Sequence, residues 1–149
     1  MKIGTVVAVA LFMVYGIPVA AVGADWALVY SRSGVSFYYD KDSINDKSAG
    51  KIELDARTTF ETDPIRQEII KERRSKGMSV EGWNKLRYVV NRIELDCSLR
   101  KYNFLSGSHY DETGNLLESD NAPGTRWNPI IDGSPMMFTY NAVCHAPKR

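Results

Sequence analysis

Few residues in this 149-residue chain have the types and spacing that catalysis requires. The two histidines, His109 and His145, lie too far apart in the sequence to bind one metal ion from a single helix. No Gly-x-Ser-x-Gly motif supplies a serine nucleophile, and no glycine-rich loop is present to hold a phosphate. The sequence therefore predicts a protein that is not an enzyme and that uses neither a metal nor a cofactor.

The first two dozen residues have the composition of a secretory signal peptide. Lys2 is the only charged residue among them, an apolar stretch follows from Ile3 to Val14, and the segment ends in small residues. A basic start, a short apolar core and a small-residue end are the parts of a signal peptide. Pro18 and the small residues favour cleavage over an uncleaved membrane anchor. We therefore predict a signal peptide over 1–24 and one exported domain over 25–149, in the periplasm or at the cell surface.

The cysteines predict a covalent link inside the exported domain. Two cysteines allow a single pairing, and an exported chain meets oxidising conditions. We therefore predict a disulfide between Cys97, in the middle of the chain, and Cys144, near its C-terminal end. Two free thiols are the alternative. Closing so long a loop stabilises a fold by about 4 kcal/mol in the chain-entropy treatment.

The charge balance argues against nucleic acid as a partner. The formal net charge is +1, and without Lys2 the 18 remaining basic residues equal the 18 acidic ones. A neutral chain has no broad positive field to attract nucleic acid or anionic lipid. We also expect no stable membrane span after removal of the signal peptide, because a spanning helix needs about 20 consecutive apolar residues.

A local excess of basic residues gives the best candidate for an exposed binding surface. Between Pro64 and Gly77 five basic residues outnumber two acidic ones. The candidate surface consists of Arg73, Arg74, Lys76 and the loop residue Trp83, and it could bind an acidic partner or phospholipid headgroups among envelope or extracellular macromolecules. The alternative is an ordinary solvated helix face whose charges pair with one another.

The elements that must position these residues follow from hydrophobic patterning. Apolar residues alternate with polar ones over Lys51–Phe60, where Lys51, Glu53, Asp55 and Arg57 share the wet face. The same alternation over Leu86–Leu99 points Cys97 and Leu99 to the core. Further strands are predicted at 26–30, 35–39, 102–110 and 116–119, with an extended segment at 127–131.

Two helices complete the prediction. One begins at Asp63-Pro64, with Asp63 as its N-cap, and ends at Gly77; the other begins at Ser134-Pro135 and ends near Cys144. Strands and helices do not alternate as in a parallel α/β fold. We therefore predict the α+β class, with an antiparallel sheet of five to six strands, one central helix, and a C-terminal helix that packs on the sheet and is tied to it by the disulfide.

Short motifs in a fixed order accompany this pattern. They are Trp26, Phe37-Tyr38-Tyr39-Asp40, Ser43-Ile44, Asp96-Cys97, Tyr110-Asp111, Gly114, Trp127, Pro129-Ile130, Gly133-Ser134 and Val143-Cys144. Together they resemble the surface-adhesin protein E family of small exported bacterial proteins. The resemblance implies a place at the cell envelope and binding of other macromolecules. Unlike the named adhesin, this chain has no cysteine for lipid attachment near the predicted cleavage site.

Three hypotheses of function follow. The first is a non-enzymatic, adhesin-like binding module of the bacterial envelope. The second is a periplasmic protein that binds a small ligand on a concave, aromatic-lined sheet face, and the third is a secreted hydrolase with a carboxylate pair. Exposed sheet edges also make a homodimer a reasonable expectation.

Overall fold

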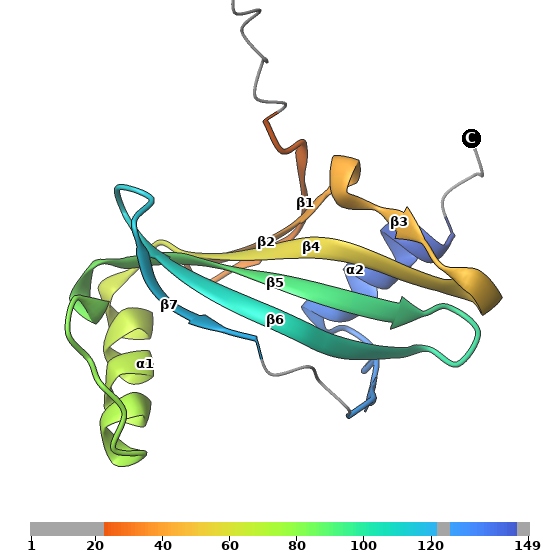
Figure 1. Ribbon diagram of the computed structural model, residues 1–149. Helices are drawn as coiled ribbons and strands as arrows, with labels where there is room; N and C mark the ends of the chain where they lie inside the picture. Colours follow the sequence, from red (N-terminus) through yellow and green to blue (C-terminus); the bar gives the residue numbers. More distant parts are fainter. Residues whose placement is uncertain (1–22, 122–125, 146–149) are drawn as a thin grey trace, which may run out of the picture.

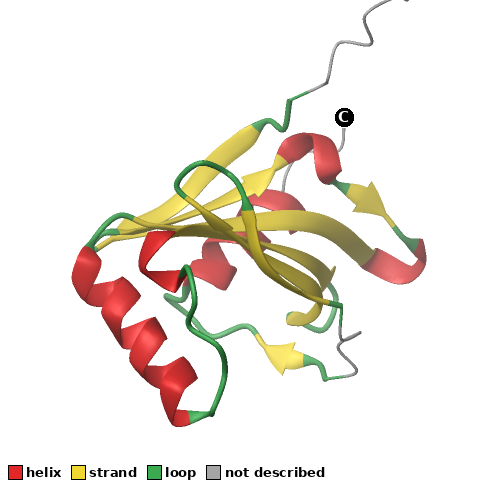
Figure 2. Ribbon diagram, turned by 60° about the vertical axis from the view of Figure 1, so that its left-hand side comes forward, coloured by secondary structure: helices red, strands yellow, loops and turns green. Residues whose placement is uncertain are grey.

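The computed structural model describes residues 23–121 and 126–145, so nearly all of the predicted signal peptide lies outside the described residues. The described part is one antiparallel sheet with two α-helices, α1 (Asp63–Ser75) and α2 (Pro135–Cys144). Helix α1 lies at one end of the sheet and α2 crosses behind its central strands (Figure 1). The turned view in Figure 2 also shows α1 beside one end of the sheet.

The sheet has eight strands, and its main path follows the order β1-β2-β4-β5-β6-β7. Their bounds are β1 Trp26–Arg32, β2 Val35–Asp40, β4 Lys51–Phe60, β5 Leu86–Asp96, β6 Lys101–Asp111 and β7 Leu116–Asp120. The other two, β3 (Asn45–Asp46) and β8 (Asn128–Pro129), pair with β4 and β6. The antiparallel prediction is confirmed, but the count of five to six is too low, because a two-residue strand is too short for alternation to reveal.

Both predicted α-helices are present, together with three 3₁₀ helices that patterning did not predict, η1 (Lys41–Ser43), η2 (Ser48–Gly50) and η3 (Trp83–Lys85). The N-cap of α1 is Thr62, one residue before the predicted Asp63, which instead forms an ion pair with Arg66. The predicted stop is in place, since Gly77 follows α1 with a φ of 69° that favours glycine.

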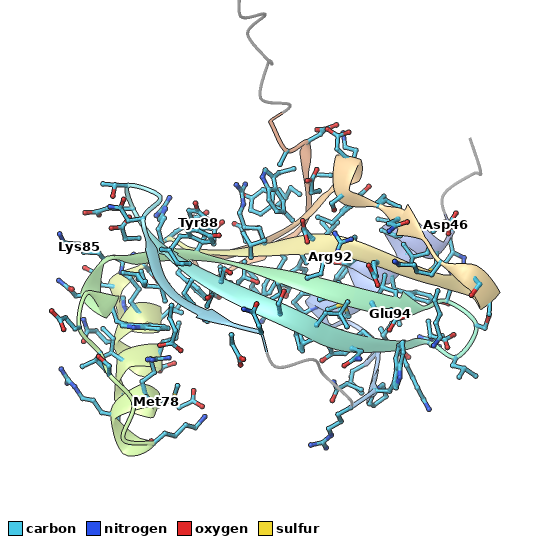
Figure 3. All side chains as sticks on the ribbon, in the orientation of Figure 1. Asp46, Met78, Lys85, Tyr88, Arg92 and Glu94 are labelled. Carbon is cyan, nitrogen blue, oxygen red and sulfur yellow. A yellow bond between two sulfur atoms is a disulfide. The ribbon has the colours of Figure 1, made fainter. Side chains whose placement is uncertain are left out.

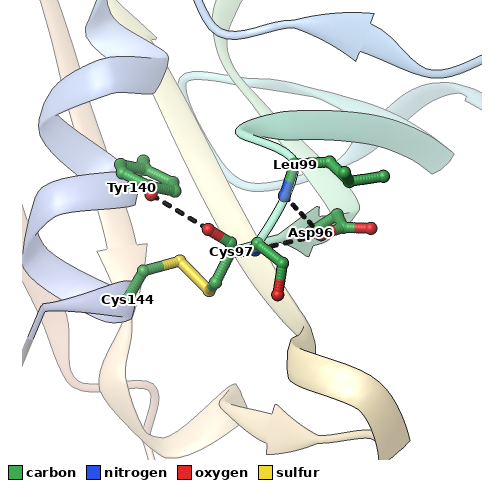
Figure 4. Close-up of a disulfide and its surroundings, with 6 residues drawn as sticks. Asp96, Cys97, Leu99, Tyr140 and Cys144 are labelled. Atoms are coloured by element: carbon green, nitrogen blue, oxygen red, sulfur yellow. Dashed lines mark hydrogen bonds between the residues drawn. A yellow bond between two sulfur atoms is a disulfide. The ribbon is translucent and has the colours of Figure 1, made fainter.

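Strand β5 ends at Asp96, three residues earlier than predicted. The Asp96 carboxylate accepts hydrogen bonds from the backbone N–H groups of Ser98 and Leu99, at 3.0 and 2.8 Å (Figure 4). An aspartate that binds the backbone two and three residues ahead turns the chain. Leu99, predicted to face the core, is therefore 63% exposed in the turn.

Two hydrophobic clusters place both helices on the same face of the sheet. The larger joins Leu54, Ile93 and Leu95 of the central strands to Met137, Tyr140 and Val143 of α2. The smaller joins Ile70 of α1 to Trp83 and Leu86, with Phe60 and Leu117 packed against it. The opposite face carries neither α-helix, and we call it the open face.

The predicted disulfide holds α2 on the sheet. Cys97 and Cys144 are bonded, with their Cα atoms 5.6 Å apart, a usual separation for a disulfide. The Tyr140 hydroxyl donates to the carbonyl oxygen of Cys97 at 3.0 Å, so a hydrogen bond accompanies the covalent bond (Figure 4). At the other end of α2, the Ser134 hydroxyl oxygen accepts from the Met137 N–H at 3.3 Å, as expected of an N-cap.

Replacing both Cys97 and Cys144 by alanine should lower the free energy of unfolding by about 4 kcal/mol, because the unfolded chain is no longer restricted by a closed loop. Urea denaturation followed by circular dichroism measures the difference. Wild-type protein denatured in the presence of a thiol reductant is the matched control and should behave like the variant. Equal stability of the oxidised wild type and the double variant would contradict the assignment.

Candidate functional site

The predicted basic surface is only partly exposed. Arg73 and Trp83 are buried, at 8% and 3% exposure, so the expectation that they form an exposed surface is wrong. The Arg73 guanidinium lies 3.6 Å from the centre of the Trp83 ring, donates to the Ser79 carbonyl oxygen at 2.9 Å and forms an ion pair with Glu118. Arg73 and Trp83 thus fasten α1 to the sheet.

The sequence does contain a signal for the burial of Arg73. It follows Ile70 by three residues and Ile69 by four, so it continues the apolar stripe of α1. Trp83 is turned inward because η3 begins after Gly82, whose φ of 75° reverses the chain. A polar loop sequence gives no hint of that turn.

Arg74, in the last turn of α1, and Lys76, its C-cap residue, are both exposed. Lys76 pairs with Glu72 at 2.6 Å, four residues earlier on the same helix. Such an exposed pair contributes little to stability. Binding of a partner by Arg74 and Lys76 stays a prediction.

The two histidines lie in different parts of the fold, His109 half-buried on β6 and His145 exposed just after α2. His109 packs on Trp83, with ring centres 4.9 Å apart, and His145 packs edge-on against Tyr140 at 5.3 Å. Burial of His109 lowers the pKa of its imidazole, an effect that Arg73 reinforces and the Glu118 carboxylate opposes. Among the described residues no group of three His, Cys, Asp or Glu side chains could hold a metal ion.

The open face carries a cluster of aromatic rings around one arginine. The Arg57 guanidinium lies 4.5 Å from the ring centre of Trp26, 4.7 Å from Tyr38 and 5.9 Å from Tyr88. Tyr88 stacks on Tyr110 with ring centres 4.9 Å apart. These five residues, from β1, β2, β4, β5 and β6, form what we call the Arg57 cluster. All five are half-buried.

A second arginine lies further along the open face. Figure 3 shows Tyr88, Arg92 and Glu94 following one another along β5. Arg92 contacts the carboxylates of Asp55 at 3.2 Å and Glu53 at 3.4 Å. This arginine therefore has acidic partners within the chain.

The helix-bearing face is hollowed between the sheet and α2. A cavity of about 340 Å³ is lined by Phe37, Ala56, Asn91, Phe104, Ile131 and Met136, among others. It adjoins a second cavity of about 310 Å³, which shares Asn91 and Phe104 and reaches His109 and Asp120. A Cβ atom on Gly107 would approach the Asn91 side-chain oxygen to 2.9 Å, so glycine leaves room for this amide. We call the two cavities together the α2 groove.

A carboxylate pair occurs in a third, smaller pocket of about 270 Å³. Glu61 and Glu112 line it together with Arg66, Lys85 and Arg87. Three cations around two carboxylates differ from the apolar surroundings that keep one carboxyl protonated in a glycoside hydrolase. This geometry does not favour the hydrolase hypothesis.

The family model for surface-adhesin protein E matches residues 26–145, which include every described strand and both α-helices. The chain belongs to the surface-adhesin protein E family. The resemblance found in the short motifs is therefore confirmed. No curated protein matches the chain by sequence.

Solved structures of Haemophilus influenzae protein E have a similar fold. Crystal form II of that protein superposes with a TM-score of 0.54 at 15% identity, covering 78% of this chain and 91% of that chain. Protein E from non-typeable Haemophilus influenzae superposes with a TM-score of 0.52 at 13% identity, covering 87% of this chain and 81% of that chain. At such identities the likeness shows the fold alone.

Several motifs of this adhesin-family chain serve the fold. Asp111 accepts hydrogen bonds from the backbone N–H groups of Thr113 and Asn115 at 2.9 and 2.8 Å. Hydrogen bonds, first of all that from the Thr113 hydroxyl, lower the Asp111 pKa to about 2. Asp40 accepts from the backbone nitrogens of Asp25 and Asp42, at 3.0 Å each. These aspartates close turns between strands.

The lowered pKa of His109 predicts a pH dependence of stability. Because the folded protein holds a proton on His109 less tightly than the unfolded chain, the stability is fully present above the ordinary value of 6.5 and falls as the pH drops below it. Denaturation midpoints measured between pH 8 and pH 5 should show this decline. The decline in stability should be smaller in His109→Gln than in the wild type, and as large as in the wild type in the control His145→Gln. A decline in His109→Gln as large as that of the wild type would contradict the prediction.

Proposed function

We propose that the chain is exported, loses residues 1–24, and acts from 25–149 as a non-enzymatic adhesin-like protein that binds extracellular or envelope macromolecules. Membership of the surface-adhesin protein E family supports this role. The described residues contain no helix long and apolar enough to cross a membrane. The proposed place of action is the cell surface or the periplasm.

One observation carries the proposal further than the family name. Both α-helices pack on the same face of the sheet, so the Arg57 cluster on the open face is covered by neither. Tryptophan, tyrosine and arginine are the residues most enriched at the energetic centres of protein interfaces. A half-buried aromatic surface that neither α-helix covers is therefore suited to contact with a macromolecule. Arg74 and Lys76, exposed at the C-terminal end of α1, form a second and separate surface for the same purpose.

The test combines fractionation with binding. Mass spectrometry of protein from the native cells should find a chain that begins at residue 25, and intact cells should react with an antibody if the protein is displayed. The purified mature protein should be retained on surfaces coated with extracellular-matrix proteins or with envelope fractions, and not on albumin, the matched control. Retention by none of these, together with an intracellular location, would contradict the proposed function.

The α2 groove favours a second candidate function, the binding of a small apolar ligand. Cavities of about 300–1,000 Å³ with apolar walls and a few polar groups are typical of ligand sites. Phe104 and Ile131 at the groove are 42% and 62% exposed, which leaves apolar surface for a ligand to cover. The Asn91 amide supplies a polar group shared by both cavities.

Filling the groove tests this candidate. The apolar fluorescent probe anilinonaphthalene sulfonate should gain fluorescence with wild-type protein and lose most of that gain with Ala56→Phe, because the larger ring occupies the cavity. Ser108→Phe, on the open face, is the control and should leave the signal unchanged. Equal fluorescence from wild type and Ala56→Phe would show that the probe does not bind in the groove.

A further inference from the structure

The Arg57 cluster has the chemistry of a site for a carboxylate. We propose that Arg57 and its rings bind an aspartate or glutamate side chain in an acidic segment of a protein partner. This inference rests on the proposed function, because it names the site and the partner chemistry through which an adhesin-like protein would bind.

The arrangement of the rings leaves the edge of the guanidinium available. A ring attracts a guanidinium through its face, whereas the N–H groups point outward in the guanidinium plane. Three rings lie within 5.9 Å of Arg57. Its Nε is enclosed and has no hydrogen-bond partner among the described residues, and the terminal amino groups are not enclosed in this way. The pair of terminal amino groups, which can donate two hydrogen bonds to one carboxylate, is thus held in position and has no hydrogen-bond partner among the described residues.

Arg57 differs in this respect from Arg92, the other arginine described on the open face. Arg92 lies on the same face and is paired with Asp55 and Glu53. Arg57 has no ion pair with any residue that the structure describes, although Asp55 is only two residues away on β4. Within the part of the chain that the structure describes, this half-buried cation has rings around it and no counter-charge, and an external carboxylate would supply one.

The surroundings of the cluster favour a protein segment over an acidic sugar. Leu28 lies directly opposite Tyr38 in the register of β1 and β2 and is 58% exposed. Together with the outer parts of the tyrosine and tryptophan rings, Leu28 gives the site an apolar border. An acidic residue flanked by apolar side chains matches a cation with an apolar border, whereas a saccharide presents hydroxyl groups there.

The experiment uses the mature protein and two blocked peptides. The first has the sequence Gly-Leu-Glu-Leu-Gly, and the second has glutamine in place of glutamate. Titrations followed by NMR of the Arg57 Nε–Hε signal should show a shift that saturates with the glutamate peptide and little change with the glutamine peptide. Arg57→Lys should weaken binding of the first peptide about tenfold, because lysine keeps the charge and loses the planar fork. The matched control Arg92→Lys, on the same face, should leave the affinity within about twofold.

Each opposite result overturns the inference. Equal binding of the two peptides would show that the carboxylate is not recognised. Equal affinity of wild type and Arg57→Lys for the glutamate peptide would show that Arg57 is not the binding residue. Saturable binding of glucuronate without binding of the glutamate peptide would assign the cluster to acidic sugars instead. The wild-type NMR titration stands even if Arg57→Lys does not fold. If the peptides do not bind at Arg57 but the protein is still retained on matrix proteins, this inference fails and the proposed function stands. The proposed function fails when the protein is retained on none of those surfaces and is found inside the cell.

Discussion

Cys97 and Cys144 join the turn after β5 to the last residue of α2, and Tyr140 adds a hydrogen bond to the same turn. A helix this short is not stable by itself in water, so its position depends on what it packs against. The apolar contacts of Met137 and Val143 hold it to the central strands, and the covalent link prevents it from leaving. The larger hydrophobic cluster and one wall of the α2 groove both exist because α2 is held in this place.

The position of the helices divides the sheet into two faces with different chemistry. On the helix-bearing face, apolar residues of the strands are buried under α2 and α1, with the α2 groove between sheet and helix. On the open face, rings and charged residues take the place of a second layer. An antiparallel sheet commonly has one packed and one solvated face. Here the solvated face carries the four rings of the Arg57 cluster, which are the basis for proposing it as an interface.

Local signals were sufficient to predict the main elements. Alternation identifies β4 and the whole of β5, and Ser134-Pro135 marks the start of α2, because each of these depends on neighbours in sequence. The short strand β3 has no counterpart in the prediction, since two residues carry no period, whereas β8 lies within the extended segment expected over 127–131. The early end of β5 was missed because it depends on hydrogen bonds made by the Asp96 side chain.

The candidate sites were less predictable than the elements. Alternation along β4 places Arg57 on the solvent-facing side of the strand, but its rings come from other strands and contact it only through the register that sets Tyr38 opposite Arg57. That register is a tertiary property, and the sequence of one strand does not contain it. The inward turn of Trp83 and the burial of Arg73 likewise depend on how α1 meets β6 and β7. The stripe formed with Ile70 was the one local sign of it.

The hydrogen bond between Asp25 and Asp40, just before β1, would change when the signal peptide is cleaved. In the full chain the Asp25 nitrogen is an ordinary amide that donates to the Asp40 carboxylate at 3.0 Å. Cleavage after residue 24, as proposed, would convert this nitrogen into a positively charged amino group facing an acceptor already in place. A neutral hydrogen bond would become a charge-assisted one next to Trp26, the first residue of the sheet. Processing of the precursor would thereby fix the first strand more firmly in the folded protein.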